Sequence, residues 1–216
     1  MNESLMTIAQ VRRALHAPRP GRPAQQRMSP RPRPGDIFPM PQNASGKQAA
    51  VLILLYERAG ELYFFLTRRT ESVGTHKGQI SLPGGGQDKG EALRDTALRE
   101  AREELGLDAS DIEIVSEPLT PLYIPVSDFW VTAFVGYACC GEPKLHLSEH
   151  EVVEILPTRL AEVLDEANIV EEEWELRGTR VMVPFFNLRG YKVWGATAMI
   201  LSEFASLLRA QTIEVP

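Results

Sequence analysis

Three glutamates lie close together in one short stretch of the chain and could hold a divalent cation. Glu100, Glu103 and Glu104 would fall within an arc of about 100° on a helix that turns about 100° per residue. Carboxylates this close repel one another. Divalent cations that prefer oxygen ligands would offset that repulsion. The spacing therefore indicates a metal-binding helix face.

The neighbouring residues support this interpretation. Arg99 stands four residues before Glu103 and can pair with it. A glycine-rich loop precedes the helix, where Gly85 could bring a backbone carbonyl close as a further ligand. Apolar residues recur at every fourth position, so another helix face is expected to be buried. They are Leu93, Ala97, Ala101 and Leu105. The alternative is an exposed acidic helix with ion pairs, the commoner origin of a charge run.

Seven residues form a motif with fixed spacing. They are Gly85, Glu91, Arg99, Glu100, Glu103, Glu104 and Gly106. The motif matches every fixed position of the Nudix box, and the chain resembles that hydrolase family. At single-residue frequencies of about 6%, a chance match has a probability of about 10⁻⁸ to 10⁻⁹ per start position. The resemblance implies the α/β (α+β) class and a Nudix fold, with a mixed β-sheet sandwiched between helices.

The same resemblance implies a role for each motif residue. Mg²⁺ or Mn²⁺ would be held by four residues: Gly85, Glu100, Glu103 and Glu104. Glu103 and Glu100 are then also candidate catalytic residues. The remaining motif residues, Glu91, Arg99 and Gly106, would form the scaffold together with Gly85. The metal ions would neutralise a pyrophosphate group and lower the pKa of an attacking water. We expect a pyrophosphohydrolase that acts on acid anhydrides in phosphorus-containing compounds.

Flanking residues resemble the coenzyme A pyrophosphatase subgroup of the family. The segments that carry this likeness are 66–69 (Leu-Thr-Arg-Arg), 76–79 (His-Lys-Gly-Gln) and 194–198 (Trp-Gly-Ala-Thr-Ala). The implied substrate is coenzyme A or acyl-CoA, cleaved to phosphopantetheine and adenosine 3′,5′-bisphosphate. The candidate substrate-binding residues are Arg68, Arg69, His76, Lys77 and Gln79. Gly74 stands where the subgroup has an arginine, a natural phosphate contact.

Two other functions stay open. A broader Nudix pyrophosphatase would act on ADP-ribose, dinucleotides or nucleoside triphosphates. A Nudix-fold sensor would bind a nucleotide without turnover, but it would not need the complete set of box glutamates. Glu151 lies in a loop where Nudix enzymes sometimes place an extra carboxylate, so it is a candidate base. Trp130 and Trp194 are expected to lie in the core, with packing on an adenine ring as the alternative.

Composition limits the partners. The formal net charge is −6, which argues against a nucleic-acid scaffold. No apolar run reaches transmembrane length, and the N-terminus does not have the pattern of a signal peptide. The adjacent Cys139 and Cys140 would point to opposite faces of a strand, so they do not suggest a disulfide. We expect a cytoplasmic enzyme with a CoA-like small-molecule nucleotide substrate and neither a nucleic-acid nor a membrane partner. A homodimer is left open.

The predicted organisation has two parts. Residues 1–46 would form a helix over 4–16 and a Pro/Arg-rich arm, with an extended linker over 18–41. Residues 47–216 would form the hydrolase domain. The expected strands are 49–56, 62–67, 79–82, 112–123, 130–138, 181–186 and 191–194. The expected helices are 91–105, 157–166 and 197–209, and residues 171–175 are expected to be an acidic turn. Asp88 would cap the first of these helices, and Gly106 would end it.

Overall fold

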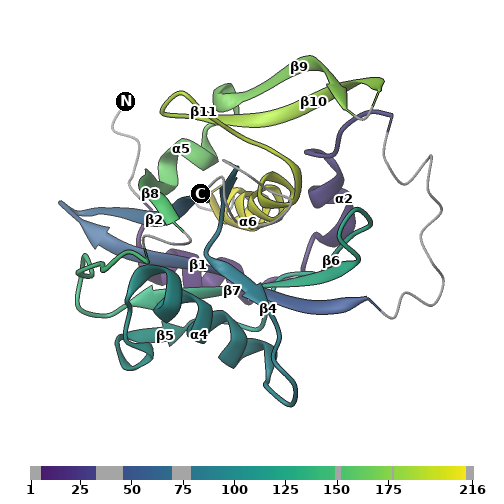
Figure 1. The fold of residues 1–216 in the computed structure, drawn as a ribbon. Coiled ribbons are helices and arrows are strands. Elements are labelled where there is room, and N and C mark those ends of the chain that lie inside the picture. Colours follow the sequence, from purple (N-terminus) through teal and green to yellow (C-terminus); the bar gives the residue numbers. More distant parts are fainter. Residues whose placement is uncertain (1–5, 33–45, 70–78, 149–151, 177, 213–216) are drawn as a thin grey trace.

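The centre of the fold is a mixed sheet built around one hairpin (Figure 1). The computed structural model describes residues 6–32, 46–69, 79–148, 152–176 and 178–212. Strands β1 (Lys47–Arg58) and β2 (Glu61–Arg69) pair antiparallel. The two turn residues, Ala59 and Gly60, both have positive φ, as this short kind of hairpin turn requires. The strands predicted over 49–56 and 62–67 are confirmed, and they form this hairpin.

Strand β7 (Phe129–Ala138) runs parallel to β1 and makes the sheet mixed. The main path runs β3-β2-β1-β7-β5, with β4 beside β1, β6 beside β7 and β8 beside β2. The shorter strands are β3 (Ile80–Ser81), β4 (Gly84–Gly86), β5 (Ile112–Ile114), β6 (Leu122–Ile124) and β8 (Val152–Arg159). The prediction of one strand over 112–123 is wrong, because β5 and β6 are separate strands that both pair with β7.

Helices cover both faces of this sheet. Helix α4 (Leu93–Leu105) packs on one face, against Leu52, Leu54 and Phe134 among others. Helices α1 (Ile8–Leu15) and α6 (Gly195–Thr212) pack on the other face, where Ile53 and Leu55 point. Because β1 is buried on both faces, its sequence is a nearly continuous apolar run. The predicted mixed sheet between helices is therefore confirmed.

A second, three-stranded sheet lies beyond α6 (Figure 1). It consists of β9 (Ile169–Leu176), β10 (Thr179–Leu188) and β11 (Tyr191–Val193), all antiparallel. The acidic turn predicted for residues 171–175 is wrong, because these residues belong to β9. The helix predicted over 157–166 is also wrong at its start. Pro157 lies in β8, and the helix α5 is only Leu160–Leu164.

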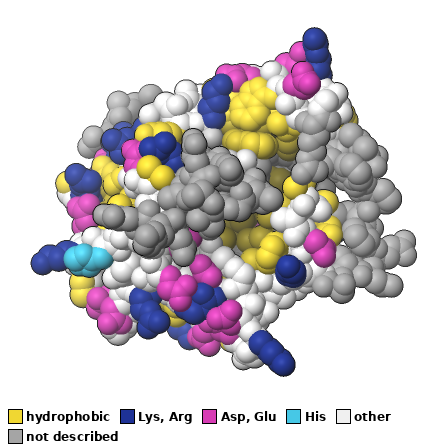
Figure 2. All heavy atoms as spheres, in the orientation of Figure 1, with side chains coloured by type: hydrophobic (Ala, Val, Ile, Leu, Met, Phe, Trp, Pro, Cys, Tyr) yellow, Lys and Arg dark blue, Asp and Glu magenta, His cyan; other side chains and the backbone are white. Residues whose placement is uncertain are grey.

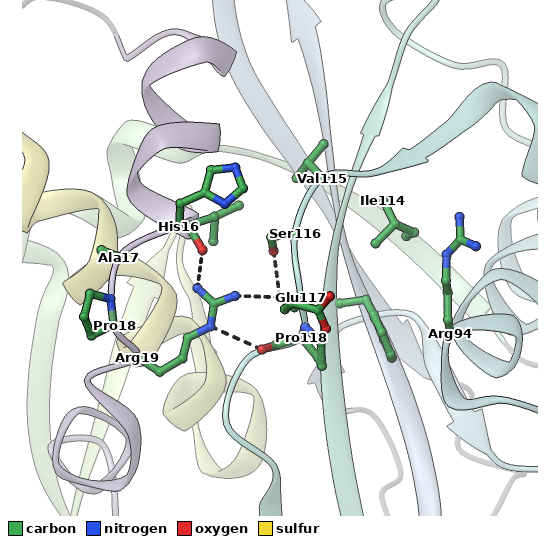
Figure 3. Close-up of a pocket in the computed structure, with 12 residues that line it drawn as sticks. His16, Ala17, Pro18, Arg19, Arg94, Ile114, Val115, Ser116, Glu117 and Pro118 are labelled. Carbon is green, nitrogen blue, oxygen red and sulfur yellow. Dashed lines mark hydrogen bonds between the residues drawn. The ribbon is translucent and has the colours of Figure 1, made fainter.

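The N-terminal segment is part of the core as far as it is described. The linker predicted from residue 18 is wrong for residues 18–32, because helix α2 (Gly21–Gln26) packs against α6. Met28 is buried in the same cluster as α1 and α6. Arg19 connects this segment to the residues between β5 and β6. Its guanidinium donates hydrogen bonds to the backbone oxygens of Leu15, Glu117 and Pro118 (Figure 3). Residues 33–41 of the predicted linker lie outside the described residues.

Within the described ranges, no helix is both long enough and apolar enough to cross a membrane.

Candidate active site

Helix α4 carries the acidic motif, and its ends differ in how well they were predicted. The helix begins at Leu93 with Ala92 in the N-cap position, so the prediction of Asp88 as N-cap is wrong. The other half of the predicted capping pattern is present, because the Asp88 N–H donates to Glu91 at 3.2 Å. Gly106 ends the helix in the left-handed conformation with φ 69°, as predicted.

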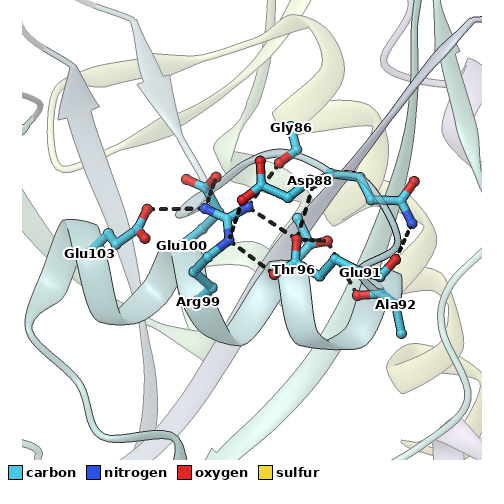
Figure 4. A network of polar contacts seen from close by, with 9 residues as sticks. Gly86, Asp88, Glu91, Ala92, Thr96, Arg99, Glu100 and Glu103 are labelled. Atoms are coloured by element: carbon cyan, nitrogen blue, oxygen red, sulfur yellow. Dashed lines mark hydrogen bonds and ion pairs between the residues drawn. The ribbon is translucent and has the colours of Figure 1, made fainter.

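Arg99 is the centre of the site (Figure 4). Its Nε donates to Glu91 at 3.0 Å, and its Nη1 donates to Glu100 at 2.8 Å and to Glu103 at 3.0 Å. Its Nη2 donates to the Gly86 carbonyl at 2.9 Å. One guanidinium therefore connects the glycine loop to two successive turns of the helix, and the predicted pair with Glu103 is present.

The electrostatics of this network favour full ionisation of Glu91. The hydrogen bond from Arg99, followed by that from Thr96, lowers the pKa of Glu91 to about 2. The hydrogen bond to Glu91 in turn raises the pKa of Arg99. Glu91 is thus held as a carboxylate throughout the physiological pH range, which keeps the loop attached to the helix.

The glycine loop lies directly against two of the predicted metal ligands. A Cβ added to Gly85 would lie 2.5 Å from the carboxylate of Glu100. Only glycine lets this carboxylate reach the backbone so closely. On the next turn, Glu104 is 2% exposed and accepts a hydrogen bond from the Gly84 N–H at 3.2 Å. Strand β4 and α4 together hold these carboxylates around one loop.

Among the described residues, several carboxylates surround the single cation Arg99. Four carboxylates lie within ion-pair distance of Arg99, at 2.8 to 3.7 Å: Asp88, Glu91, Glu100 and Glu103. Among the described residues, no three Asp, Glu, His or Cys side chains already converge as ligands of a metal ion. The donor set nevertheless suits a hard divalent cation, because it combines carboxylates with a loop carbonyl, and the space a Cβ would fill at Gly85 is taken by a carboxylate.

The structure describes only some of the predicted substrate contacts. Arg68, on β2, donates from Nε to Glu154 on β8 at 3.0 Å, and the Tyr191 hydroxyl donates to the same carboxylate at 3.0 Å. Gln79 is half-buried and directly precedes β3. Arg69 belongs to β2 through its backbone. Three predicted site residues lie outside the described residues: His76, Lys77 and Glu151.

Cavity size does not locate the site. A groove of about 700 Å³ lies between the N-terminal segment, β5 and α4, and a depression of about 320 Å³ lies on the outer side of α4. Neither is lined by Glu100, Glu103 or Glu104. The carboxylates around the glycine loop, and not the volume of either depression, define the candidate site.

Both tryptophans that were predicted to be core residues are only half-buried. Trp130 contacts Tyr123, with ring centroids 5.1 Å apart, and Trp194 contacts Trp174 at 5.2 Å. Each therefore retains exposed aromatic surface. The core prediction is wrong for both because each stands at a strand end, next to a loop.

Glu154 and Tyr191, which link the two sheets through Arg68, were not predicted. Strand β8 was missed because Pro157 was taken as the start of a helix, although proline is tolerated in a strand that pairs on one side only. The alternation of charged and apolar residues over 173–176 was the signal that could have predicted β9.

Comparison with known proteins identifies the family. The family model described as the NUDIX domain matches residues 46–177. This match covers the mixed sheet, the glycine loop and the acidic helix α4, whereas α1 and α6 lie outside it. The chain belongs to the Nudix family.

Several relatives carry the family name. The chain is 34% identical over 172 residues to Nudix hydrolase 22, a chloroplastic protein of Arabidopsis thaliana, covering 75% of this chain and 55% of that protein. It is also 34% identical over 160 residues to NudL of Cronobacter sakazakii, named an uncharacterized Nudix hydrolase, covering 74% of this chain and 81% of that protein. The chain therefore spans little more than half the length of the plant relative.

Solved structures show the same fold. An Ap4A hydrolase of C. elegans matches with a TM-score of 0.50 at 18% identity, covering 76% of this chain and 98% of that chain. A MutT/nudix family protein from Enterococcus faecalis matches with a TM-score of 0.52 at 19% identity, covering 81% of this chain and 66% of that chain. At these identities the likeness concerns the fold alone.

Proposed function

We propose that this protein hydrolyses a pyrophosphate linkage inside a nucleoside-diphosphate compound, with Mg²⁺ or Mn²⁺ as cofactor. The observation that carries the proposal is the set of four described carboxylates around Arg99, directly against the glycine loop. An acidic site and a polyanionic substrate repel each other unless cations lie between them.

The residues that would hold the metal are Glu100, Glu103 and Glu104, with the backbone carbonyl of Gly85. When bound, the metal ions would neutralise the pyrophosphate and supply an activated water. Glu91 and Arg99 would keep the loop and helix in register through the hydrogen bonds between them. Glu151 is our candidate base on the sequence resemblance alone.

For the substrate we propose coenzyme A or an acyl-CoA. The support is the resemblance of segments 66–69, 76–79 and 194–198 to the coenzyme A pyrophosphatase subgroup. A broader preference for ADP-ribose, dinucleotides or nucleoside triphosphates is the second candidate. It is favoured by Gly74, where the subgroup has an arginine, and by Arg68, which is paired with Glu154. A cytoplasmic location and a homodimer remain predictions from the sequence.

A substrate panel tests the proposal. Purified protein with Mg²⁺ or Mn²⁺ is incubated with CoA, an acyl-CoA, ADP-ribose, NADH and 8-oxo-dGTP, and products are separated by chromatography. We expect CoA to yield 4′-phosphopantetheine and adenosine 3′,5′-bisphosphate, and excess EDTA to abolish turnover. Cleavage of ADP-ribose but not CoA would leave only the general pyrophosphatase assignment. Turnover that persists after complete metal removal would reject the metal-dependent mechanism.

The variant Gly74→Arg sharpens the choice of substrate. A guanidinium at this position would be able to contact the 3′-phosphate of CoA, which ADP-ribose does not have. A charge-assisted contact of this kind contributes about 1.5–3 kcal/mol. We expect the KM for CoA to fall more than the KM for ADP-ribose. An equal change for both substrates would reject a specific contact to the extra phosphate.

A further inference from the structure

The three-stranded sheet carries an aromatic cluster to which the proposed chemistry gives no role. Trp174 on β9 stacks on Phe185 of β10, with ring centroids 5.9 Å apart and planes 25° apart. Trp194, directly after β11, meets Trp174 at 5.2 Å with planes 78° apart. Phe185 is 2% exposed, whereas both tryptophans are only half-buried. The tryptophans therefore form the outer part of the cluster.

Of the two tryptophans, Trp194 has the ring face that is more available for stacking on a ligand. In a T-shaped pair one ring presents its edge to the other, so the contact covers at most one face of either ring. Trp174 is also covered by Phe185 and by the ammonium of Lys192, 5.6 Å from its ring centroid. Among the described aromatic side chains, Trp194 contacts Trp174 alone. At least one face of Trp194 therefore has no ring against it.

The cluster is held in place by polar contacts. Lys192 lies 5.2 Å from the Phe185 ring centroid and pairs with Glu172 at 2.5 Å. The same carboxylate accepts from Trp174 Nε1 at 2.9 Å. These contacts fix the orientation of Trp174, against which Trp194 packs. Lys192 and Glu172 form an ion pair, so their opposite charges cancel. Stacking on the ring, and not attraction to a net charge, would therefore provide most of the binding energy here.

The position of the cluster connects it to the glycine loop. Strand β11 contacts β3, which is followed within three residues by Gly84. The Tyr191 hydroxyl and Arg68 share the Glu154 carboxylate, which ties β11 to the main sheet. In Figure 2, hydrophobic side chains gather beneath β9 and β10 on the same face of the molecule as β4. Strand β3 therefore connects the small sheet to the loop that begins at Gly84.

We propose that Trp194, supported by Trp174 and Lys192, stacks on the purine base of the substrate while its pyrophosphate lies at the glycine loop. The inference rests on the proposed function and adds a substrate class, adenine nucleotides. A base stacks on an aromatic side chain through its π-face, which every nucleobase has, and purines present the larger face. CoA and ADP-ribose both contain adenosine diphosphate, so the stacking site serves both candidates.

Equilibrium binding of ADP tests the stacking site, with Ca²⁺ in place of Mg²⁺ because a divalent cation must lie between the acidic site and the phosphates. Chromatography confirms that ADP stays intact during the titration. We expect Trp194→Ala to raise the calorimetric Kd at least about tenfold, equivalent to about 1.4 kcal/mol. Trp194→Phe, which retains an aromatic face, should stay within about threefold of the parent protein. Trp130→Ala is the matched control, because it removes the same half-buried side chain from the other sheet, and it should leave the Kd unchanged. Equal Kd values for Trp194→Ala and the parent protein, or equal losses in Trp194→Ala and Trp130→Ala, would reject the site.

Fluorescence gives a second measurement that does not depend on folding of a Trp194 variant. The chain has three tryptophans, so Trp130→Phe leaves Trp174 and Trp194 as the only indole reporters. ADP should quench or shift their emission, and unchanged emission at saturating ADP would overturn the proposal. The two proposals fail separately. ADP binding with quenching but no hydrolysis of any compound in the panel would reject the function alone. Hydrolysis without any effect of ADP on these tryptophans would reject the stacking site alone.

Discussion

Helices α4 and α6 lie on opposite faces of the sheet, and both hold carboxylates in polar networks, but the two networks differ. On α6, Glu203 is fully buried and accepts hydrogen bonds from Gln25 Nε2 at 2.9 Å and from the Thr120 hydroxyl and N–H at 2.6 and 3.2 Å. On α4, Glu100 and Glu103 share a single nitrogen of Arg99. Donors from two distant segments meet the acid on α6, whereas on α4 two acids share one nitrogen of a single described cation.

The difference shows how to separate a structural acid from a functional one. A buried carboxylate needs donors to replace the water that it loses, and Glu203 has them from two segments of the chain that it thereby joins. On α4, Glu100 and Glu103 are brought together on one described cation, which places two like charges side by side. Residual repulsion favours a divalent cation. Removing a carboxylate should therefore affect catalysis at α4 and stability at α6.

The largest expected effect is that of Glu103→Gln. This change removes a proposed ligand charge with little change in volume, so kcat should fall at least about 10²-fold while the fold stays intact. Glu113→Gln is a closely matched control. Glu113 is also paired with an arginine, Arg12, and both glutamate side chains are 46% exposed. Steady-state kinetics with circular dichroism separates the two, and an unchanged kcat in Glu103→Gln would reject the ligand role.

Glu203→Gln is the counterpart on α6. The amide keeps the size of the side chain but turns one acceptor into a donor, next to the donors of Gln25 and Thr120. We expect the free energy of unfolding to fall by about 1–3 kcal/mol, with kcat and the metal requirement unchanged. Urea unfolding and kinetics on the same preparation measure both. A loss of kcat with an unchanged free energy of unfolding would contradict the assignment of a structural role to Glu203.

Gly85→Ala tests how closely the loop must approach the helix. The new Cβ would lie 2.5 Å from the Glu100 carboxylate, so this side chain must move. We expect the metal concentration for half-maximal activity to rise about tenfold. Gly86→Ala is the control one residue further, because its Cβ would meet only the Phe129 ring, at 3.9 Å. Equal metal dependence in both variants would contradict a role for this close approach.

The α4 region could be predicted from the sequence because its signals are local. Residue types at fixed spacing predicted the pair of Arg99 with Glu103 and the helix end at Gly106, and the structure confirms both. The start of the helix was predicted wrongly, because Asp88 has the residue type of an N-cap, whereas the helix begins five residues later. The Glu91 carboxylate accepts hydrogen bonds from Thr96 and Arg99 as well as from the Asp88 N–H. Residue spacing alone does not indicate that one carboxylate has all three donors.

The α6 side could not be predicted because its contacts join distant segments. Gln25 and Glu203 are separated by 178 positions, so neither residue indicates the other in the sequence. The proline and arginine content of residues 18–32 suggested a linker. In the structure, Arg19 donates hydrogen bonds to three backbone oxygens and holds this segment against the rest of the fold. Composition indicates the conformation that a segment would adopt in isolation. It contains no information on the distant residues that the segment contacts in the folded protein.

The smallest expected effect is a dependence of stability on pH through Glu91, which lies just before α4. The pKa of Glu91 is lowered from 4.5 to about 2 in the folded protein, chiefly by the hydrogen bond from Arg99. The folded state therefore binds the proton less readily than the unfolded state. The stabilisation is complete above the unfolded pKa and is lost as the pH falls from about 4.5 towards 2.

Comparison with Glu91→Gln isolates this contribution. The difference in free energy of unfolding between parent and variant should be constant from about pH 7 to 5.5 and should shrink steadily below about pH 4.5. Urea midpoints measured at half-unit steps down to the lowest pH at which both proteins fold would reveal the slope. The same difference at pH 5.5 and at pH 3.5 would show that Arg99 does not hold Glu91 as a carboxylate, and the scaffold on which the α4 site depends would need another explanation.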